Sequence, residues 1–147
     1  MKYQVGRLGR AFIIQLEHGD DVMAELVRLA EQEDINTAVL MLIGALRSGG
    51  MVLGPEECLV PPRGIEQFFD DGRELIAIGT ILRNEEGNPS LHIHGSAGRS
   101  GSVLTGCLRR DLQAYLLVEA VMLELDEISV RRIADPNLQV KVLDWES

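Results

Sequence analysis

The segment Thr37–Leu46, TAVLMLIGAL, constrains the fold most strongly, because almost every residue in it is apolar. A strand covered on both faces has such a composition, whereas a strand with one face in water alternates apolar and polar residues. The length of the segment also permits a buried helix. The β-branched residue at its start and the helix expected just before it favour a strand. The segment therefore predicts a strand that other parts of the chain cover on both sides.

The residues before this segment predict one strand and one helix. The run Arg10–Glu17 is rich in β-branched and aromatic residues and predicts a strand that ends at a Gly-Asp turn. Asp20 or Asp21 can then cap a helix that runs to about Glu33. Its apolar residues recur at helical spacing on one face: Val22, Leu26, Leu29 and Ala30.

The rest of the chain contains strand-like segments separated by turns and predicts no second helix. These segments are Met51–Leu53, Glu74–Arg83, Pro89–Gly95, Ser102–Leu108, Ala114–Leu125, Ile128–Ile133 and Leu138–Leu143. Arg47–Gly50 predicts a turn into a hairpin, and Pro55–Gly72 an irregular excursion. Many strands that do not alternate with helices predict an α+β fold, with a mainly antiparallel sheet flanked by one principal helix. We expect residues 1–147 to form a single domain.

Charge and cysteine content narrow the function classes. With 14 Lys and Arg against 23 Asp and Glu, the net charge is −9, which disfavours direct binding to nucleic acid phosphates. The start of the chain lacks the pattern of a signal peptide, and no apolar run is long enough to span a membrane. Two cysteines do not make a disulfide framework. We therefore expect a cytoplasmic protein with no membrane segment.

The clearest chemical feature is the pair of histidines in LHIHGSAGRSGSVLTGC. Alternation along the strand Pro89–Gly95 would place His92 and His94 on one face. A hairpin through the glycine-rich turn Gly98–Gly101 would return Cys107 beside them. Two imidazoles and one thiolate suit a tetrahedral zinc ion with one open position, and sulfur favours zinc over magnesium or calcium.

These residues also have ordinary structural explanations. Two histidines on a half-buried strand can simply satisfy local hydrogen bonds, and a single cysteine often serves as a small buried apolar residue. His18 is expected in an exposed loop. Arg47 follows small residues at a strand end, where it could bind the carboxylate or phosphate of a ligand, or could be a plain surface arginine.

Three blocks of the sequence together resemble the PPC domain, the plants and prokaryotes conserved domain that plant nuclear proteins carry beside AT-hooks. The blocks are Gly9–Gly54, with GRAFIIQLEHGDD at its start, Pro89–Leu108, with PSLHIHGSAGRSG, and Ala114–Leu125. The resemblance covers nearly the whole chain and implies an α+β homotrimer. It also implies a metal site, commonly zinc, on the histidines that match His92 and His94. Cys107 stands where the family has a third histidine, which departs from the pattern.

The resemblance and the residues together leave three hypotheses for function. The first is a stand-alone trimeric regulatory or interaction module, associated with DNA or transcription through protein partners, with a metal or small-ligand pocket. The second is a zinc-dependent enzyme that acts on a small molecule at His92, His94 and Cys107. The third is direct DNA binding, as the family is usually described. The acidic charge and the lack of an AT-hook argue against the third hypothesis.

Overall fold

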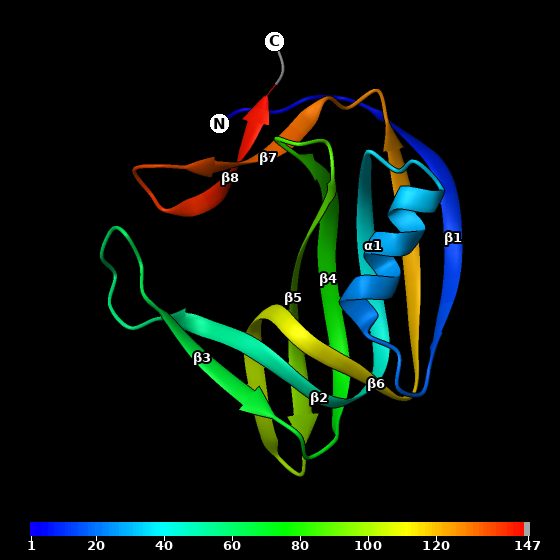
Figure 1. Cartoon of the computed structure of the whole chain (residues 1–147), viewed down its shortest axis with the longest axis vertical. Helices are drawn as coiled ribbons and strands as arrows, with labels where there is room; N and C mark the ends of the chain where they lie inside the picture. The colour runs from blue at the N-terminus through cyan, green and yellow to red at the C-terminus, as the bar shows by residue number, and fades with distance from the viewer. Residues whose placement is uncertain (146–147) are drawn as a thin grey trace.

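The structure, a computed structural model, describes residues 1–145 and contains eight strands and one helix within them. In chain order the elements are β1 (Arg7–Glu17), α1 (Val22–Gln32), β2 (Thr37–Pro55), β3 (Gly64–Phe69), β4 (Arg73–Asn84), β5 (Pro89–Arg99), β6 (Ser102–Asp126), β7 (Val130–Asp135) and β8 (Val140–Trp145). All strand pairs are antiparallel except β4 with β7. The mainly antiparallel α+β fold predicted from the sequence is confirmed (Figure 1).

The two longest strands, β2 and β6, bend and take part in two regions of the sheet. The first half of β2 lies between β4 and the second half of β6, while its second half pairs with β3 and the first half of β6. Because β5 pairs with both β4 and β6, the path β2–β4–β5–β6 closes on itself. Positive φ values at Gly44 (138°), Asp111 (58°) and Leu116 (62°) mark irregular points of β2 and β6.

The prediction of a turn at Arg47–Gly50 is wrong, because β2 continues through these residues to Pro55. Gly49 and Gly50 have a packing role here. A Cβ atom at Gly49 would lie 2.6 Å from Leu112, and one at Gly50 would lie 2.7 Å from Phe68. The missing side chains therefore make room for those of neighbouring strands.

Two other segment predictions need correction. The irregular excursion predicted for Pro55–Gly72 contains β3, which pairs with β2 as a hairpin. Ser102–Leu108 and Ala114–Leu125 were predicted as separate strands, but β6 runs through both. The mainly polar residues between the two apolar runs, 109–113, lie where β6 changes its register with β2. The backbone stays in the sheet through this irregular point. The predicted hairpin of Glu74–Arg83 with Pro89–Gly95 is confirmed.

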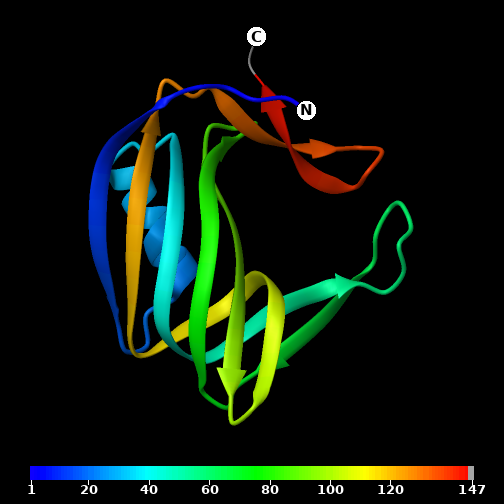
Figure 2. The same cartoon turned by 180° about the vertical axis from the view of Figure 1, so that it is seen from behind.

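The helix and the inner face of the sheet share one apolar core. Asp21 caps α1, as predicted, since its carboxylate accepts a hydrogen bond of 2.9 Å from the Ala24 amide. Val22, Leu26 and Ala30 are fully buried against a core that includes Leu40 of β2. α1 does not cover the outer face of β2, β4 and β5. Figure 2, which views the molecule from behind, shows this face. In the described residues no helix is long and apolar enough to cross a membrane.

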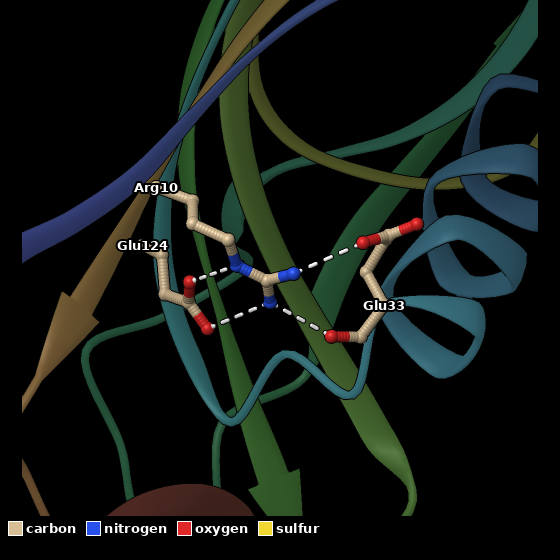
Figure 3. A network of polar contacts seen from close by, with 3 residues as sticks. All are labelled: Arg10, Glu33 and Glu124. Carbon is tan, nitrogen blue, oxygen red and sulfur yellow. Dashed lines mark hydrogen bonds and ion pairs between the residues drawn. The ribbon is translucent and has the colours of Figure 1, made fainter.

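Arg10 of β1 ties the helix end to the sheet (Figure 3). Its guanidinium donates to both carboxylate oxygens of Glu124 on β6, at 2.7 and 3.1 Å. It also donates to the side chain of Glu33, at 3.0 Å, and to the backbone carbonyl of Glu33, at 2.8 Å. Because carbonyls at a helix C-terminus lack partners within the helix, this contact both satisfies one of them and places a positive charge at the negative end of the helix dipole.

Candidate metal centre

The hairpin of β5 and β6 brings the three predicted ligands together. His92 and His94 lie on one face of β5, and Cys107 of β6 is directly opposite His94 in the register. The turn between the strands is shorter than predicted, because only Ser100 and Gly101 lie in it, with φ values of 48° and 79°. The prediction that a hairpin brings Cys107 beside His92 and His94 is therefore confirmed, and the predicted extent of the turn is wrong.

Two of the glycines near the histidines are needed within strands. Gly95 and Gly106 face each other across β5 and β6, next to His94 and Cys107. A Cβ atom at Gly95 would lie 2.8 Å from the side chain of Ala77, and one at Gly106 would overlap the carbonyl oxygen of Val52. The glycines allow the neighbouring backbones to pack closely under the candidate site.

The donor atoms of these three residues lie close enough to share one metal ion. The Nε2 atoms of His92 and His94 are 3.1 Å apart, and all three donor atoms lie within 4.8 Å of one another. Donors around a tetrahedral zinc, with bonds of about 2.0 to 2.3 Å, are roughly 3.3 to 3.8 Å apart. Small side-chain rotations would therefore bring two nitrogens and one sulfur into a zinc coordination sphere.

The electrostatics of the site favour the neutral form of His92. Burial lowers the pKa of His92, and the charges of Arg132, His94 and Arg109 lower it further. A neutral ring keeps the lone pair that binds a metal. Burial raises the pKa of the Cys107 thiol, while Arg109 and Arg132 act in the opposite direction. The cysteine is only 5% exposed, so a cation nearby would be needed to stabilise its thiolate.

Two hollows adjoin the three residues. A hollow of about 490 Å³ lies between β5 and the β7–β8 hairpin and includes His92 in its lining. A second, of about 600 Å³, lies towards the β2–β3 hairpin and includes His94 and Cys107. Arg109 lines both, so the site is accessible from two connected sides.

Sequence reasoning missed Arg132 of β7. This residue is only 6% exposed and lines the smaller hollow together with His92. Its position alternates with Val130, which is also buried, so the burial pattern of β7 predicts an apolar residue at position 132. A charged residue at an inward position of a strand is the signal that could have identified it.

Arg47 lies in a different hollow, of about 700 Å³, which shares no lining residue with the other two. Arg73 and Arg99 line it too, and both contact the carboxylate of Asp71. His18 is exposed in this hollow, as predicted, and its Nδ1 accepts a 3.1 Å hydrogen bond from the Leu116 amide. The structure therefore does not bring Arg47 or His18 to the histidine pair.

Comparison with known proteins identifies relatives of this fold. The sequence model of the Plants and Prokaryotes Conserved (PCC) domain matches residues 3–126. The metal-containing protein of Archaeoglobus fulgidus has a TM-score of 0.85 and 22% identity over the full length of both chains. The plant- and prokaryote-conserved protein of Pyrococcus horikoshii has a TM-score of 0.81 and 22% identity, over 100% of this chain and 98% of that chain.

A candidate DNA-binding protein of Ralstonia eutropha has a TM-score of 0.76 and 24% identity, over 91% of this chain and 90% of that chain. No curated protein matches the sequence. At these identities the solved structures establish a shared fold.

Proposed function

Because this chain belongs to the Plants and Prokaryotes Conserved (PCC) domain family, we propose that it is a homotrimeric regulatory or interaction module with a zinc site at His92, His94 and Cys107. The observation that carries the proposal is that their three donor atoms lie within 4.8 Å of one another. The metal-containing protein of Archaeoglobus fulgidus has the same fold. Both cysteines of the chain are free, which agrees with a cytoplasmic protein.

The chain's own residues have distinct roles at this site. His92 and His94 would bind through imidazole nitrogens, and burial favours the neutral form of His92. Cys107 would bind through a thiolate, which burial disfavours and the charges of Arg109 and Arg132 favour. Zinc held by three protein ligands supplies a Lewis acid with one open position. That position suits a ligand from solution or a group from a partner.

The zinc site is tested by elemental analysis of protein purified without a histidine tag or chelator. The wild type should contain close to one zinc per chain, and His92→Ala and Cys107→Ala should lose it. Cys58→Ala is the matched control, because Cys58 is exposed and lies outside the histidine site. Wild-type protein that stays free of metal after incubation with zinc would refute the site.

The proposed homotrimer has support from an exposed apolar face. The register aligns its side chains across β1, β6, β2 and β4, on the side away from α1. Five of these residues are between 40% and 83% exposed: Ile13, Met41, Ile43, Ile76 and Ile78. An apolar surface that spans several strands marks a contact with another protein. Ile78 is also directly opposite His94 in the register, so the zinc site borders this face.

Light scattering after size-exclusion chromatography tests the assembly. The wild type should have three times the mass of one chain, and Ile78→Asp should release monomers, because a carboxylate buried in the interface would lack a partner. Leu59→Asp is the control, since Leu59 is similarly exposed but lies outside the strands of this face. A wild-type monomer at micromolar concentration would contradict the proposal.

A zinc-dependent enzyme is the second candidate function. The observation in its favour is that two hollows of about 490 and 600 Å³ open beside the three ligands, a size that suits small molecules. Glu66 is the carboxylate in their combined lining and would be the candidate general base. It pairs with Arg110 at 3.1 Å. Hydrolysis of small esters or amides by wild type, lost in His92→Ala and in Glu66→Gln, would support an enzyme.

Association with DNA is proposed through protein partners rather than by direct contact. One neighbour in fold is a candidate DNA-binding protein, whereas this chain carries a net charge of −9. Direct binding would require a basic face and would weaken steeply as salt rises. Duplex DNA titrated at 20 to 200 mM salt separates the two, and tight binding with a steep salt slope would favour direct contact.

The hollow at Arg47 completes the proposal as a separate small-ligand site. Arg73 and Arg99 in the same lining both contact the carboxylate of Asp71, so Arg47 is the arginine proposed to bind the ligand. A planar guanidinium binds a carboxylate or phosphate through paired hydrogen bonds. Arg47→Gln should weaken the binding of a carboxylate or phosphate there without changing the zinc content.

A further inference from the structure

We infer that the hollow beside His92 binds a small oxyanion, the carboxylate or phosphate of a small molecule, through Arg132, Arg109 and Lys141. This inference deepens the proposed zinc site by naming the charge of the ligand that would bind next to it. Anion binding itself requires no metal and can be measured separately.

Arg132 is a buried charge without a partner of opposite charge. Its Nη2 donates a 2.8 Å hydrogen bond to the hydroxyl of Thr80, and its buried Nε has no acceptor. Among residues 1–145 no carboxylate lies within 4.0 Å of its guanidinium. Buried charges in proteins are normally paired or bind ions, because an unpaired one loses its hydration without compensation. The buried Nε–H of Arg132 is therefore a donor that an anion from solution could satisfy.

The charged side chains that line the hollow around Arg132 are all basic. Its lining includes Arg109 and Lys141, and its remaining residues are uncharged or histidine: Leu91, His92, Gln139 and Val140. No acidic side chain lines it, although the chain as a whole has 23 acidic residues against 14 basic ones. Three cations gathered without a carboxylate in an acidic protein make a local positive potential that attracts anions.

The shape and chemistry of the hollow select the class of anion. A volume of about 490 Å³ accommodates a small molecule. The guanidinium groups of Arg132 and Arg109 are planar forks that match the two oxygens of a carboxylate or phosphate. The exposed Lys141 on β8 can approach the same anion as a flexible point charge.

The anion would lie next to the proposed zinc ligands, because His92 lines this same hollow. Zinc adds positive charge to a region that already holds three cations. An anion in the hollow offsets that charge, so zinc and the anion should each strengthen the binding of the other. Thermodynamic linkage requires the two effects to be equal.

Calorimetric titration of the full chain tests the inference, with inorganic phosphate and acetate as separate probes of the two oxyanions. Chelator-treated wild type should bind at least one of them at low salt. Arg132→Met should weaken that binding by about tenfold to a hundredfold, since it removes charge-assisted hydrogen bonds. Arg132→Lys keeps the charge without the fork and should give an intermediate loss. Arg110→Gln is the matched control, because Arg110 adjoins Arg109 but does not line the hollow.

The outcomes separate this inference from the proposed function. If zinc does not bind but the chelator-treated protein binds the anion through Arg132, the inference stands and the zinc site fails. If zinc binds and neither anion binds with or without it, the inference alone is overturned. Equal anion affinity in wild type and in a folded Arg132→Met variant would also overturn it. The inference would also be overturned if the wild type bound a single-stranded oligonucleotide more tightly than phosphate and acetate, and if Arg132→Met abolished that preference.

Discussion

Replacing Arg132 with methionine should stabilise the protein when neither metal nor anion is present. The substitution keeps a long side chain at an inward position of β7 and removes a guanidinium that has no carboxylate partner in the described chain. An enzyme or binding protein often gives up stability at the site where it recognises a ligand. If Arg132 is such a residue, its removal should raise stability and weaken anion binding together.

The size of the effect follows from the contacts of Arg132. The substitution loses one hydrogen bond, to Thr80, whose half-buried hydroxyl can turn to another partner. It also removes the desolvation penalty of a charged residue that is only 6% exposed. Replacement of buried ionic groups by apolar ones is often stabilising, by about 1 to 4 kcal/mol. After allowance for the lost hydrogen bond, we expect about 1 to 3 kcal/mol. For a chain of 147 residues this corresponds to a rise in Tm of roughly 2 to 12 °C.

Thermal unfolding followed by circular dichroism, in a chelating buffer without phosphate or carboxylates, measures this shift. Arg109→Met is the control, because Arg109 is exposed and its loss should change stability by about 0.5 kcal/mol at most. Adding phosphate at a hundred times the wild-type Kd should stabilise the wild type by about 2.7 kcal/mol. The same concentration should stabilise the variant by only about 0.4 to 1.4 kcal/mol, because its Kd is expected to be tenfold to a hundredfold higher. A lower Tm for Arg132→Met in the anion-free buffer would show that the guanidinium is already compensated, and the reasoning would be refuted.

Two further predictions concern packing and pH. Gly106→Val should destabilise the protein by about 3 kcal/mol or more in urea denaturation, because its Cβ would overlap the carbonyl oxygen of Val52 and force β2 from β6; an unchanged urea midpoint would contradict this. The hydrogen bonds from Arg10 lower the pKa of Glu124 in the folded protein. Ionised Glu124 therefore stabilises the fold at pH values above its unfolded pKa of about 4.3, and this stability is lost as the pH falls through the folded pKa. Urea midpoints measured from pH 3 to 7 should therefore fall less steeply on acidification for Glu124→Gln than for wild type, and parallel curves would exclude the linkage.

The sequence predicted the elements whose signals are local. The run Thr37–Leu46 is the first half of β2, and the cap at Asp21 begins the helix as expected. The spacing of His92 and His94 needed only the alternation of a strand, and the position of Cys107 needed only a hairpin. These features depend on residues near one another in the chain, which is why pattern alone was sufficient.

The features that the sequence did not predict depend on distant contacts. Gly49 and Gly50 have the composition of a turn, and only the approach of Leu112 and Phe68 explains them as strand residues. Arg132 has the composition of a surface residue, and it becomes notable only when β7 pairs with β4 and brings it to the hollow of His92. The three residues were therefore predictable as neighbours in the fold, and the basic hollow beside them was not.

The proposed zinc ligands and two of the residues proposed to bind the anion lie in different segments of the chain. The proposed zinc ligands lie within residues 3–126, which match the family, whereas Arg132 and Lys141 belong to the β7–β8 hairpin beyond them. Two residue pairs join β7 to β4, whereas the pairs between β5 and β6 involve no residue of the β7–β8 hairpin. Substitutions at Arg132 and Lys141 should therefore change the binding of the proposed anion while the proposed zinc ligands stay in place.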